Sequence, residues 1–489
     1  MKKLLCMLAA LLLLTGCAEE RKQMQEAGIY LSDEGVTVQG YAADAVYTEN
    51  DIIYYPTGMD VTFGEGTEDD AHDKAEADAH TVVHIAKPGT YRVTGTLPAG
   101  QIAVDLGEDA EDDPEAVVTL VLDNADITCT VAPAVIFYNV YECGDKDEPS
   151  ETVDTAAAGA NVILEEGSIN YVTGSYVAKI YKEGTVELSE DGTEVRDAKK
   201  LHKYDAALYS KMSMNVGGSG KLYITAENEG LDTELHLTVN GGEVYIRSGN
   251  DGINTNEDGV SVTTINGGLV DITVTGETGE GDGIDSNGWL VINGGEVRAS
   301  ACGFSMDAGI DSDMGIFLNG GKIAVSGHML DRIEGGTAHF AVFSFAQEQE
   351  GGQEYTLKTA DGQTVVTVIP ENSFSVLILS DDALAEGDYT LCRGAEDLFV
   401  ATGSSVGGRM PPADLPEGER PELPEGFDLP EGERPEPPEG FDLPEGERPE
   451  QPEGIDPGGK KFPEGQLPQM GESATVFTVK KGENYFTVG

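Results

Sequence analysis

Two carboxylates flank a glycine–isoleucine pair in the sequence GDGIDSNG (281–288), where Asp282 precedes the pair and Asp285 follows it. The same pattern, an oxygen-bearing side chain on each side of a Gly-Ile or Gly-Leu pair, recurs elsewhere in the chain. Carboxylate and amide oxygens are the ligands that calcium prefers in proteins. The chain carries 89 acidic and 30 basic residues, so carboxylates brought together would repel one another unless a cation lay between them. The pattern therefore predicts calcium binding.

These Gly-Ile and Gly-Leu pairs start at Gly230 and follow one another at spacings of 22, 31 and 26 residues. If consecutive repeats stack at the strand separation of about 4.8 Å, the polar positions form outward-facing columns, and one ion between two repeats reaches oxygens of both. Any single Asp or Asn could instead serve its own turn, because both residue types bond their own backbone there. In the last copy, Ala308 displaces Asp307 from the pattern. The predicted metal ligands are Asp232, Asp251, Asn254, Asp282, Asp285, Asn287, Asp311 and Asp313, of which Asp251, Asn254, Asp282 and Asp285 are the strongest candidates.

The elements that must position these residues belong to a second, offset repeat. The motif Asn-Gly-Gly followed by an alternating apolar segment begins at residues 240, 266, 293 and 319, and the related segment GSGKLYI begins at 218. Strand-sized units at a period in the twenties are typical of a solenoid in which each repeat stacks on its neighbours. The glycines supply the positive φ that each corner needs. The predicted fold is all-β, a parallel β-helix, with an inward-facing ladder made of Leu222, Ile224, Val244, Ile246, Val270, Ile272, Val297, Ala299, Ile323 and Val325.

Composition divides the chain into six segments. We expect a signal peptide at 1–16, an acidic tether with the first strands at 17–79, the parallel β-helix at 80–330, a β cap at 331–402, a linker at 403–471 and a terminal strand at 472–489. The cap is needed because a solenoid must cover its last apolar layer. The linker carries a 14-residue Pro/Glu/Gly repeat, which predicts an extended, disordered segment without a core.

The N-terminus determines the expected location. Two lysines precede an apolar run that ends in Leu-Thr-Gly-Cys at residues 14–17, and this resembles the lipobox of bacterial lipoproteins, in which the cysteine is acylated. An ordinary secretory signal is the alternative. The run is too short to span a bilayer, and no other segment could do so. We expect the protein on the outer face of the bacterial cell membrane, attached through lipid on Cys17.

A formal net charge of −59 restricts the partners. It disfavours nucleic acid and any membrane contact beyond the lipid anchor, since phosphates would be repelled. The cysteines of the mature chain lack the CxxC spacing of zinc or redox sites. An extracellular location permits a bridge between Cys129 and Cys143, while burial of all four cysteines as small apolar residues is equally compatible. His80 and His84, four residues apart in a predicted strand, are expected to be structural or solvated.

The lipobox, GSGKLYI, the Asn-Gly-Gly repeats and GDGIDSNG together resemble a family of bacterial surface carbohydrate-binding proteins. The likeness runs from about Thr81 to Gly394. It implies a right-handed parallel β-helix similar to that of pectate lyases, calcium held by the Asp-Gly-Ile-Asp repeats, and binding of polygalacturonate or cellulose without demonstrated cleavage. The acidic linker repeat and the acidic N-terminal run are outside this likeness.

The predicted function is therefore calcium-dependent binding of a polysaccharide, not its cleavage. The surface is acidic, so a uronate polymer would need calcium as a bridge, whereas a neutral glucan would need aromatic platforms. Candidates for sugar contact are Trp289, Tyr223, Tyr245 and Arg247, although each aromatic side chain could equally cover the wall of the fold. A calcium-dependent lyase is the enzymatic alternative, with Arg247 or Arg298 as the base. An adhesion or scaffold protein without a glycan ligand is the third reading.

Overall fold

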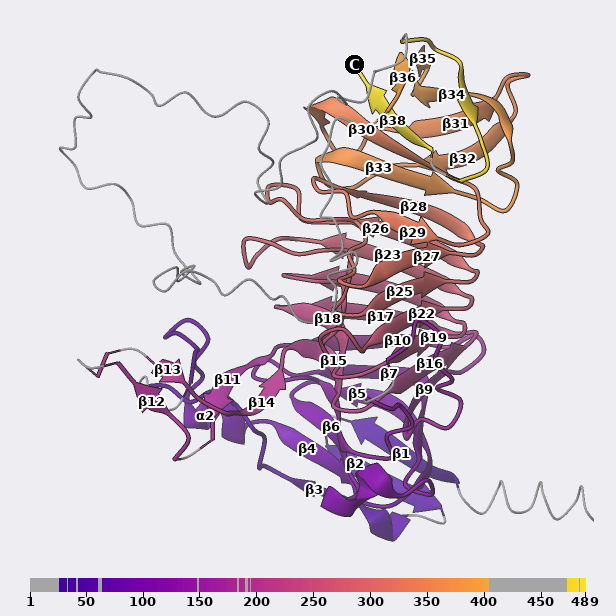
Figure 1. The fold of residues 1–489 in the computed structure, drawn as a ribbon. Coiled ribbons are helices and arrows are strands. Elements are labelled where there is room, and N and C mark those ends of the chain that lie inside the picture. Colours follow the sequence, from indigo (N-terminus) through magenta and orange to yellow (C-terminus); the bar gives the residue numbers. More distant parts are fainter. Residues whose placement is uncertain are drawn as a thin grey trace, which may run out of the picture. The chain divides into compact units, whose positions relative to one another are not determined.

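The computed structural model describes residues 26–403 and 473–489, apart from short gaps at 33, 41–42, 60–63, 147–148, 183, 190–191, 194 and 483. The expected signal peptide, Cys17 and almost all of the linker 403–471 lie outside the described residues. Within these ranges nearly all regular structure is β-strand, and the one α-helix is α2 (Lys74–Asp78) (Figure 1). No helix in the described ranges is long and apolar enough to cross a membrane. The all-β class is thus confirmed.

Each Asn-Gly-Gly motif opens a strand, and these strands pair in parallel from one repeat to the next (Figure 1). Leu222 lies opposite Val244 and Val244 opposite Val270, and the register continues without a shift to Ile323. All ten residues of the predicted inward ladder are buried, with exposures of 3% or less, which confirms that prediction. The strands that follow the motif are β20 (Glu243–Ser248), β23 (Leu269–Val274), β26 (Glu296–Ser300) and β28 (Lys322–Gly327), and the same ladder begins with β10 (Ile169–Gly174) and β17 (Lys221–Ala226).

A ladder of asparagine side chains marks the corner before these strands. Nδ2 of Asn266 donates to Oδ1 of Asn240 at 2.9 Å, and the same contact links Asn293 to Asn266 and Asn319 to Asn293. The second glycine of the motif has positive φ, 82° at Gly268, where a Cβ would come within 2.4 Å of a carbonyl oxygen in the preceding repeat. Only glycine fits there. The motif repeats because each repeat needs both the side-chain contact and the turn.

Two further parallel ladders lie beside the first. One contains β16 (Met214–Gly218), β19 (Leu237–Val239), β22 (Val262–Ile265), β25 (Trp289–Ile292), β27 (Gly315–Leu318) and β29 (Ile333–Gly335). The other contains β4 (Thr81–Ile85), β6 (Gly100–Asp105), β8 (Val135–Asn139), β15 (Ala206–Ser210), β18 (Glu229–Thr233), β21 (Ile253–Thr255) and β24 (Ile284–Ser286). Leu231, Ile253 and Ile284 of the Gly-Ile series stack in register in the second of these and are buried.

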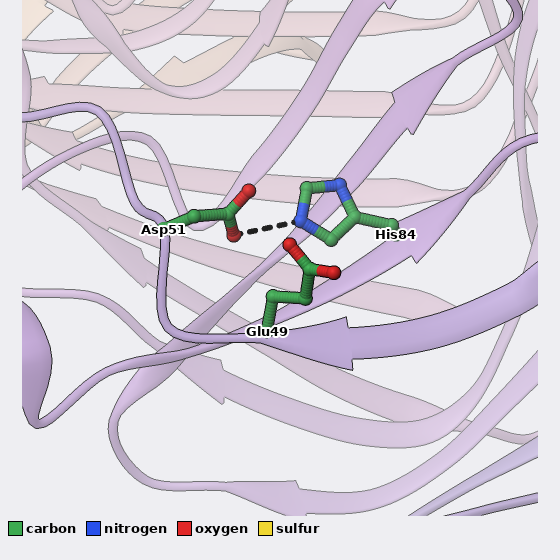
Figure 2. Close-up of side chains that lie close together, drawn as sticks. All are labelled: Glu49, Asp51 and His84. Atoms are coloured by element: carbon green, nitrogen blue, oxygen red, sulfur yellow. Dashed lines mark hydrogen bonds and ion pairs between the residues drawn. The ribbon is translucent and has the colours of Figure 1, made fainter.

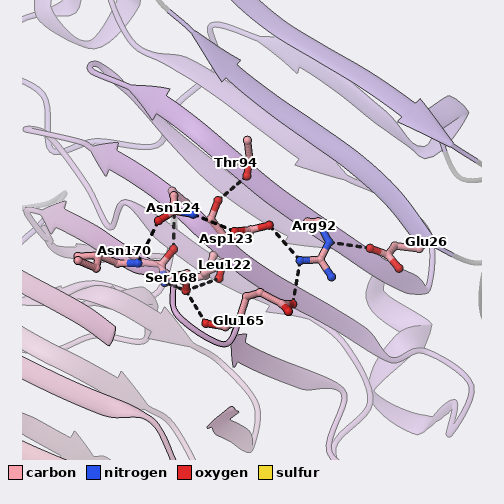
Figure 3. A network of polar contacts seen from close by, with 11 residues as sticks. Glu26, Arg92, Thr94, Leu122, Asp123, Asn124, Glu165, Ser168 and Asn170 are labelled. Atoms are coloured by element: carbon pink, nitrogen blue, oxygen red, sulfur yellow. Dashed lines mark hydrogen bonds and ion pairs between the residues drawn. The ribbon is translucent and has the colours of Figure 1, made fainter. Parts of the chain in front are cut away.

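Strands before the repeats extend the same sheets. β1 (Glu26–Ser32), β5 (Gly89–Leu97), β7 (Val118–Thr128) and β9 (Ala160–Leu164) pair in parallel, while β2 (Gly35–Gly40) and β3 (Val46–Glu49) add antiparallel strands. Arg92 on β5 donates to Glu26 at 2.9 Å, to Asp123 at 3.1 Å and to Glu165 at 2.8 Å (Figure 3). Hydrogen bonds to Glu26 and Glu165 raise the pKa of Arg92 above its ordinary value. One cation thus offsets the repulsion among three carboxylates of this acidic chain.

The acidic segment 65–79, part of the expected acidic tether, packs partly against the body of the fold. Its Asp70 accepts a hydrogen bond from Tyr176, and Ala77 of α2 is buried. Asp73 caps this helix by accepting from the backbone nitrogen of Glu76 at 2.7 Å. Carboxylates that find donors nearby can thus fold into the body instead of remaining in water. Next to this segment, a long hairpin is formed by β11 (Val177–Tyr181), β12 (Glu187–Leu188), β13 (Val195–Asp197) and β14 (Lys200–Tyr204).

Beyond residue 330 a second apolar core begins. The last repeat strand, β28, pairs antiparallel with β33 (Phe374–Ser380), which pairs with β30 (Phe340–Gln349). The core includes Phe343, Phe374 and Phe486. The end of this ladder is therefore covered by β33 and is not an open sheet edge. The remaining strands here are β31 (Tyr355–Thr359), β32 (Thr364–Val368), β34 (Gly387–Arg393), β35 (Glu396–Asp397), β36 (Val400–Thr402), β37 (Phe477–Val479) and β38 (Tyr485–Val488).

The four cysteines of the described residues are free thiols, so the bridge between Cys129 and Cys143 is not formed. Cys129, Cys302 and Cys392 are buried, and Cys143 is half-buried. Burial raises the pKa of the Cys129 thiol to about 12, which makes it unreactive at neutral pH. Three of the four therefore match the alternative of small apolar core residues.

Candidate functional site

The structure brings three of the predicted ligands together. Asp282, Asp285 and Asp311 each offer a carboxylate oxygen, and these oxygens lie within 4.8 Å of one another. Asp285 is on β24, Asp282 precedes that strand, and Asp311 belongs to the next repeat. The repeats are held in place because the backbone nitrogen of Asp311 donates to the carbonyl of Ile284 at 2.7 Å. We call these three residues the carboxylate cluster.

Burial makes the carboxylate cluster electrostatically unfavourable without a cation. Burial, followed by repulsion from Asp311 and Asp313, raises the pKa of Asp285 to about 7. Burial and the charges of Asp311 and Asp285 raise the pKa of Asp282 well above its usual range. Desolvation and like charge both disfavour ionised carboxyls here. A divalent ion among the three oxygens would reverse that effect.

Other predicted ligands also serve the backbone. Oδ1 of Asp251 accepts from the backbone nitrogen of Asp282 at 2.7 Å, and Oδ1 of Asp282 accepts from the backbone nitrogen of Ala308. The amide of Asn287 donates to the carbonyl of Asn256 and to Asp258. These bonds cross to neighbouring repeats, 26 to 31 residues away in sequence, so they are not the contacts within a residue's own turn that the alternative describes. Asp313 is exposed beside the carboxylate cluster, and Asp307 accepts from Gly281 at 2.7 Å.

A second group of ligand-type oxygens lies one to two repeats earlier in the same columns. Glu229, Asp232 and Asn254 are buried, with exposures of 5%, 0% and 5%. In the described part of the chain, no hydrogen-bond partner reaches Oε2 of Glu229, Oδ2 of Asp232 or Oδ1 of Asn254. Buried oxygens without a partner are costly, and a cation would satisfy them. The columns were expected to face solvent, and this was wrong for these residues because earlier parts of the chain, including the end of the long hairpin, cover them.

Lys203, at the end of the long hairpin, is part of that cover. Its Nζ lies 3.7 Å from Oδ2 of Asp205 and donates to Oδ1 of Asn256. Burial lowers the pKa of Lys203, but the charges of Glu229 and Asp232 outweigh it and raise the value above normal. The ammonium group of Lys203 thus balances part of the negative charge of the carboxylates in this region.

Sequence reasoning missed Asp205, Lys203 and Asp331. Burial and the charge of Glu229 raise the pKa of Asp205 to about 7, and burial with the charge of Asp311 raises that of Asp331 to about 8. Asp205 lies near Glu229 and Asp331 near Asp311, outside the Gly-Ile series, so no glycine pair marks them. Lys203 lies outside every repeat. The available sequence signal for Asp205 and Asp331 was a carboxylate located about one repeat before or after the Gly-Ile series.

The aromatic candidates separate into two places. Tyr223 and Tyr245 stack with ring centroids 4.7 Å apart, and Tyr171, which was not predicted, stacks on Tyr223 at 5.4 Å. Their strands β10, β17 and β20 are adjacent, so the matching outward positions are confirmed. Trp289 is on β25, in a different ladder. Arg247 lies 3.4 Å from Glu371, in an exposed ion pair.

A family model for carbohydrate-binding domain-containing proteins matches residues 79–144 and 144–403 of this chain. The chain belongs to this carbohydrate-binding family. The family's description names binding and no reaction. A relative from Acetivibrio thermocellus, also described as a carbohydrate-binding domain-containing protein, is 28% identical over 167 residues. That match spans 34% of this chain and 45% of the relative, less than half of the latter's length.

A solved structure of a polysaccharide lyase-like protein from C. thermocellum, a gadolinium derivative, is also similar. It is 21% identical, with a TM-score of 0.35, and the match covers 61% of this chain and 93% of that one.

This family member carries another group of metal-ligand side chains near its N-terminal end. Glu49, Asp51 and His84 bring one ligand atom each within 4.8 Å of the others, and Nε2 of His84 contacts Oδ1 of Asp51 at 2.8 Å (Figure 2). The ring of Tyr47 stacks on that of His84 with centroids 4.7 Å apart. Both carboxylates are exposed. His80 instead contacts the carbonyl of Glu76 at 2.9 Å, so the two histidines have separate structural surroundings.

Proposed function

We propose that this protein is a calcium-dependent carbohydrate-binding protein of the bacterial cell surface, which binds an acidic polysaccharide such as polygalacturonate without cleaving it. The carboxylate cluster carries the proposal. Its three oxygens lie within 4.8 Å on two half-buried aspartates and one buried aspartate, and the charge of Asp311 raises the pKa of Asp282 and Asp285. This arrangement suits a hard divalent cation with oxygen ligands. Calcium held there would supply positive charge for a sugar carboxylate on a surface that would otherwise repel it.

The ladders support the finer architecture that this proposal needs. Three sets of parallel strands follow one another once per repeat, and we infer that they form a right-handed parallel β-helix. Such a fold stacks equivalent residues of each repeat. It explains how side chains 26 to 29 residues apart in sequence come to share one cation site.

Two arginines favour binding over β-elimination. A lyase needs a base beside the metal. Arg298 is bonded to Asp271 at 3.1 Å and to Glu296 at 2.6 Å, and Arg247 pairs with Glu371. Both are on the ladder of β20, β23 and β26, not on the ladder of β24 that carries Asp285. Cellulose remains the second candidate ligand because Tyr171, Tyr223 and Tyr245 form a row of stacked rings.

Retention on insoluble polysaccharide tests the function. Purified protein is incubated with polygalacturonate gel or with cellulose, in calcium and in chelator, together with Asp285→Asn and the control Glu348→Gln. Glu348 is exposed on β30, away from the carboxylate cluster. We expect the wild type and the control to be retained on polygalacturonate only in calcium, and Asp285→Asn to be lost. Retention that ignores chelator contradicts calcium dependence, and release of unsaturated product contradicts binding without cleavage.

The location is tested separately. We propose that Cys17 carries the lipid, which rests on its lipobox alone. In a bacterial host, labelled fatty acid should be incorporated into the wild type and not into Cys17→Ser. Equal labelling of both would contradict the anchor.

A further inference from the structure

A pocket beside the carboxylate columns has a lining unlike the rest of this acidic surface. Its volume is about 460 Å³, within the range of small-molecule sites. Residues far apart in sequence form it, from the end of β8, the end of the long hairpin, β15 and the loops that follow. The aromatic and basic residues of the lining are Tyr138, Tyr204, Tyr209, Lys146, Lys203 and Lys211. We call this the lysine–tyrosine pocket.

We infer that the lysine–tyrosine pocket binds one negatively charged sugar unit of the polysaccharide, with its carboxylate toward Lys211 and Lys146 and its ring against Tyr138. This inference rests on the proposed carbohydrate-binding function and adds a subsite to it. It is separate from the candidate sugar contacts at Tyr223, Tyr245, Trp289 and Arg247, none of which lines the pocket.

The tyrosines give the pocket a preformed wall. The ring of Tyr138 meets that of Tyr204 edge to face with centroids 5.4 Å apart, and Tyr204 meets Tyr209 in the same way at 5.3 Å. Tyr209 is fixed further because its hydroxyl donates to Oε1 of Glu234 at 2.6 Å. Tyr204 and Tyr209 are buried and support the half-buried Tyr138, whose rigid ring can offer apolar area to the C–H face of a sugar at little entropic cost.

The charges in the pocket favour an anion. Lys211 is exposed and, among the described residues, has no ion-pair partner, and Lys146 has only an exposed partner, Glu257, at 3.1 Å. Two of the three glutamates in the lining already accept hydrogen bonds from the protein. Glu142 accepts from Ser213 and Gly144, and Glu234 accepts from Tyr209. The third, Glu111, is exposed.

Lys203 connects the pocket to the columns. It lines the pocket and also contacts Asp205 and Asn256, which lie along the columns. A glycan whose acidic unit contacts Lys211 would therefore lie next to the carboxylate columns. The pocket would contribute a direct lysine–carboxylate contact that calcium does not mediate.

The test is calorimetric titration of the full chain, saturated with calcium, with trigalacturonate and with its fully methyl-esterified form. The variants are Lys211→Met, Lys146→Met and their combination, and the control is Lys481→Met, an exposed lysine between β37 and β38. We expect the combined variant to bind trigalacturonate about tenfold or more weakly, as loss of charge-assisted hydrogen bonds implies. Its binding of the ester and its melting temperature should match those of the control.

Three outcomes would overturn the inference. Unchanged affinity of the combined variant for trigalacturonate, with calcium dependence intact, would remove the pocket and leave the proposed function standing. If the combined variant lost as much affinity for the methyl ester as for trigalacturonate, the lysines would not be recognising the negative charge. A wild type that binds no uronate in calcium would remove both proposals.

Discussion

At the scale of single residues, the main feature is a set of carboxylates that the fold buries at a cost. Asp282 and Asp285 each have a pKa raised by burial and by like charges, so ionisation of these carboxyl groups is unfavourable when no metal is bound. At two other places the chain supplies its own cation to nearby carboxylates: Lys203 pairs with Asp205, and Arg92 pairs with three carboxylates near the N-terminal end of the fold.

Replacement of Asp285 by Asn should separate the stabilisation that bound calcium provides from the repulsion among the carboxylates. The neutral side chain removes one of three crowded carboxylates, so we expect the metal-free variant to melt at or above the temperature of the metal-free wild type. Calcium at about 100 times its dissociation constant should stabilise the wild type by about 2.7 kcal/mol and the variant far less. Thermal melts with calcium and with chelator measure both, with Glu348→Gln as the matched control. An equal calcium shift in the variant would exclude Asp285 as a ligand.

His236 should make stability depend on pH. Burial, followed by the charge of Lys146, lowers its pKa to about 4, and its Nδ1 accepts from the backbone nitrogen of Val262 at 3.1 Å. The unfolded chain binds the proton more tightly, so this stabilisation is complete above about pH 6.5 and is lost as pH falls toward 4. We expect the wild type to lose up to about 1.4 kcal/mol per pH unit across this window relative to His236→Asn. Urea unfolding at pH 7, 6 and 5 measures the difference, and a constant difference would contradict the assignment.

At the scale of strands, the repeat builds one apolar interior from short segments. Ile272 of β23 is 1% exposed and stacks between Ile246 and Ala299. Each strand is only a few residues long, so stability comes from contacts between repeats.

Truncation of Ile272 to Ala should therefore cost about 2–5 kcal/mol in the free energy of unfolding, as for other buried isoleucines. Ile369, which is 54% exposed, provides the control, and Ile369→Ala should change stability by less than about 0.5 kcal/mol. Urea denaturation of both variants in calcium is the measurement. Equal effects would mean that the ladder does not form the core.

The same elements show what the sequence could predict. The spacing of Asn240, Asn266 and Asn293 identified the ladder and its inward residues, because each repeat must supply the same corner. The Gly-Ile series likewise placed Asp282 and Asp285 together. Sequence could not show that Asp232 is fully buried, since its cover includes Lys203 from a hairpin that belongs to no repeat. Tyr138 and Lys211 also meet only through the fold.

At the scale of the whole molecule, a chain with a net charge of −59 belongs to a carbohydrate-binding family. Long-range repulsion would keep an acidic polymer away, and salt would weaken that repulsion without creating specific contacts. Calcium bound at the carboxylate cluster, as proposed, would reverse this charge locally, and so would the lysines of the lysine–tyrosine pocket. The proposed account therefore requires that metal and glycan bind together.

A crystal structure of the protein grown with calcium and trigalacturonate tests this claim most directly. We predict an ion in contact with Asp282, Asp285 and Asp311, with a sugar carboxylate completing its coordination. Density for water alone among these three residues, in crystals where the glycan is bound elsewhere, would contradict the account.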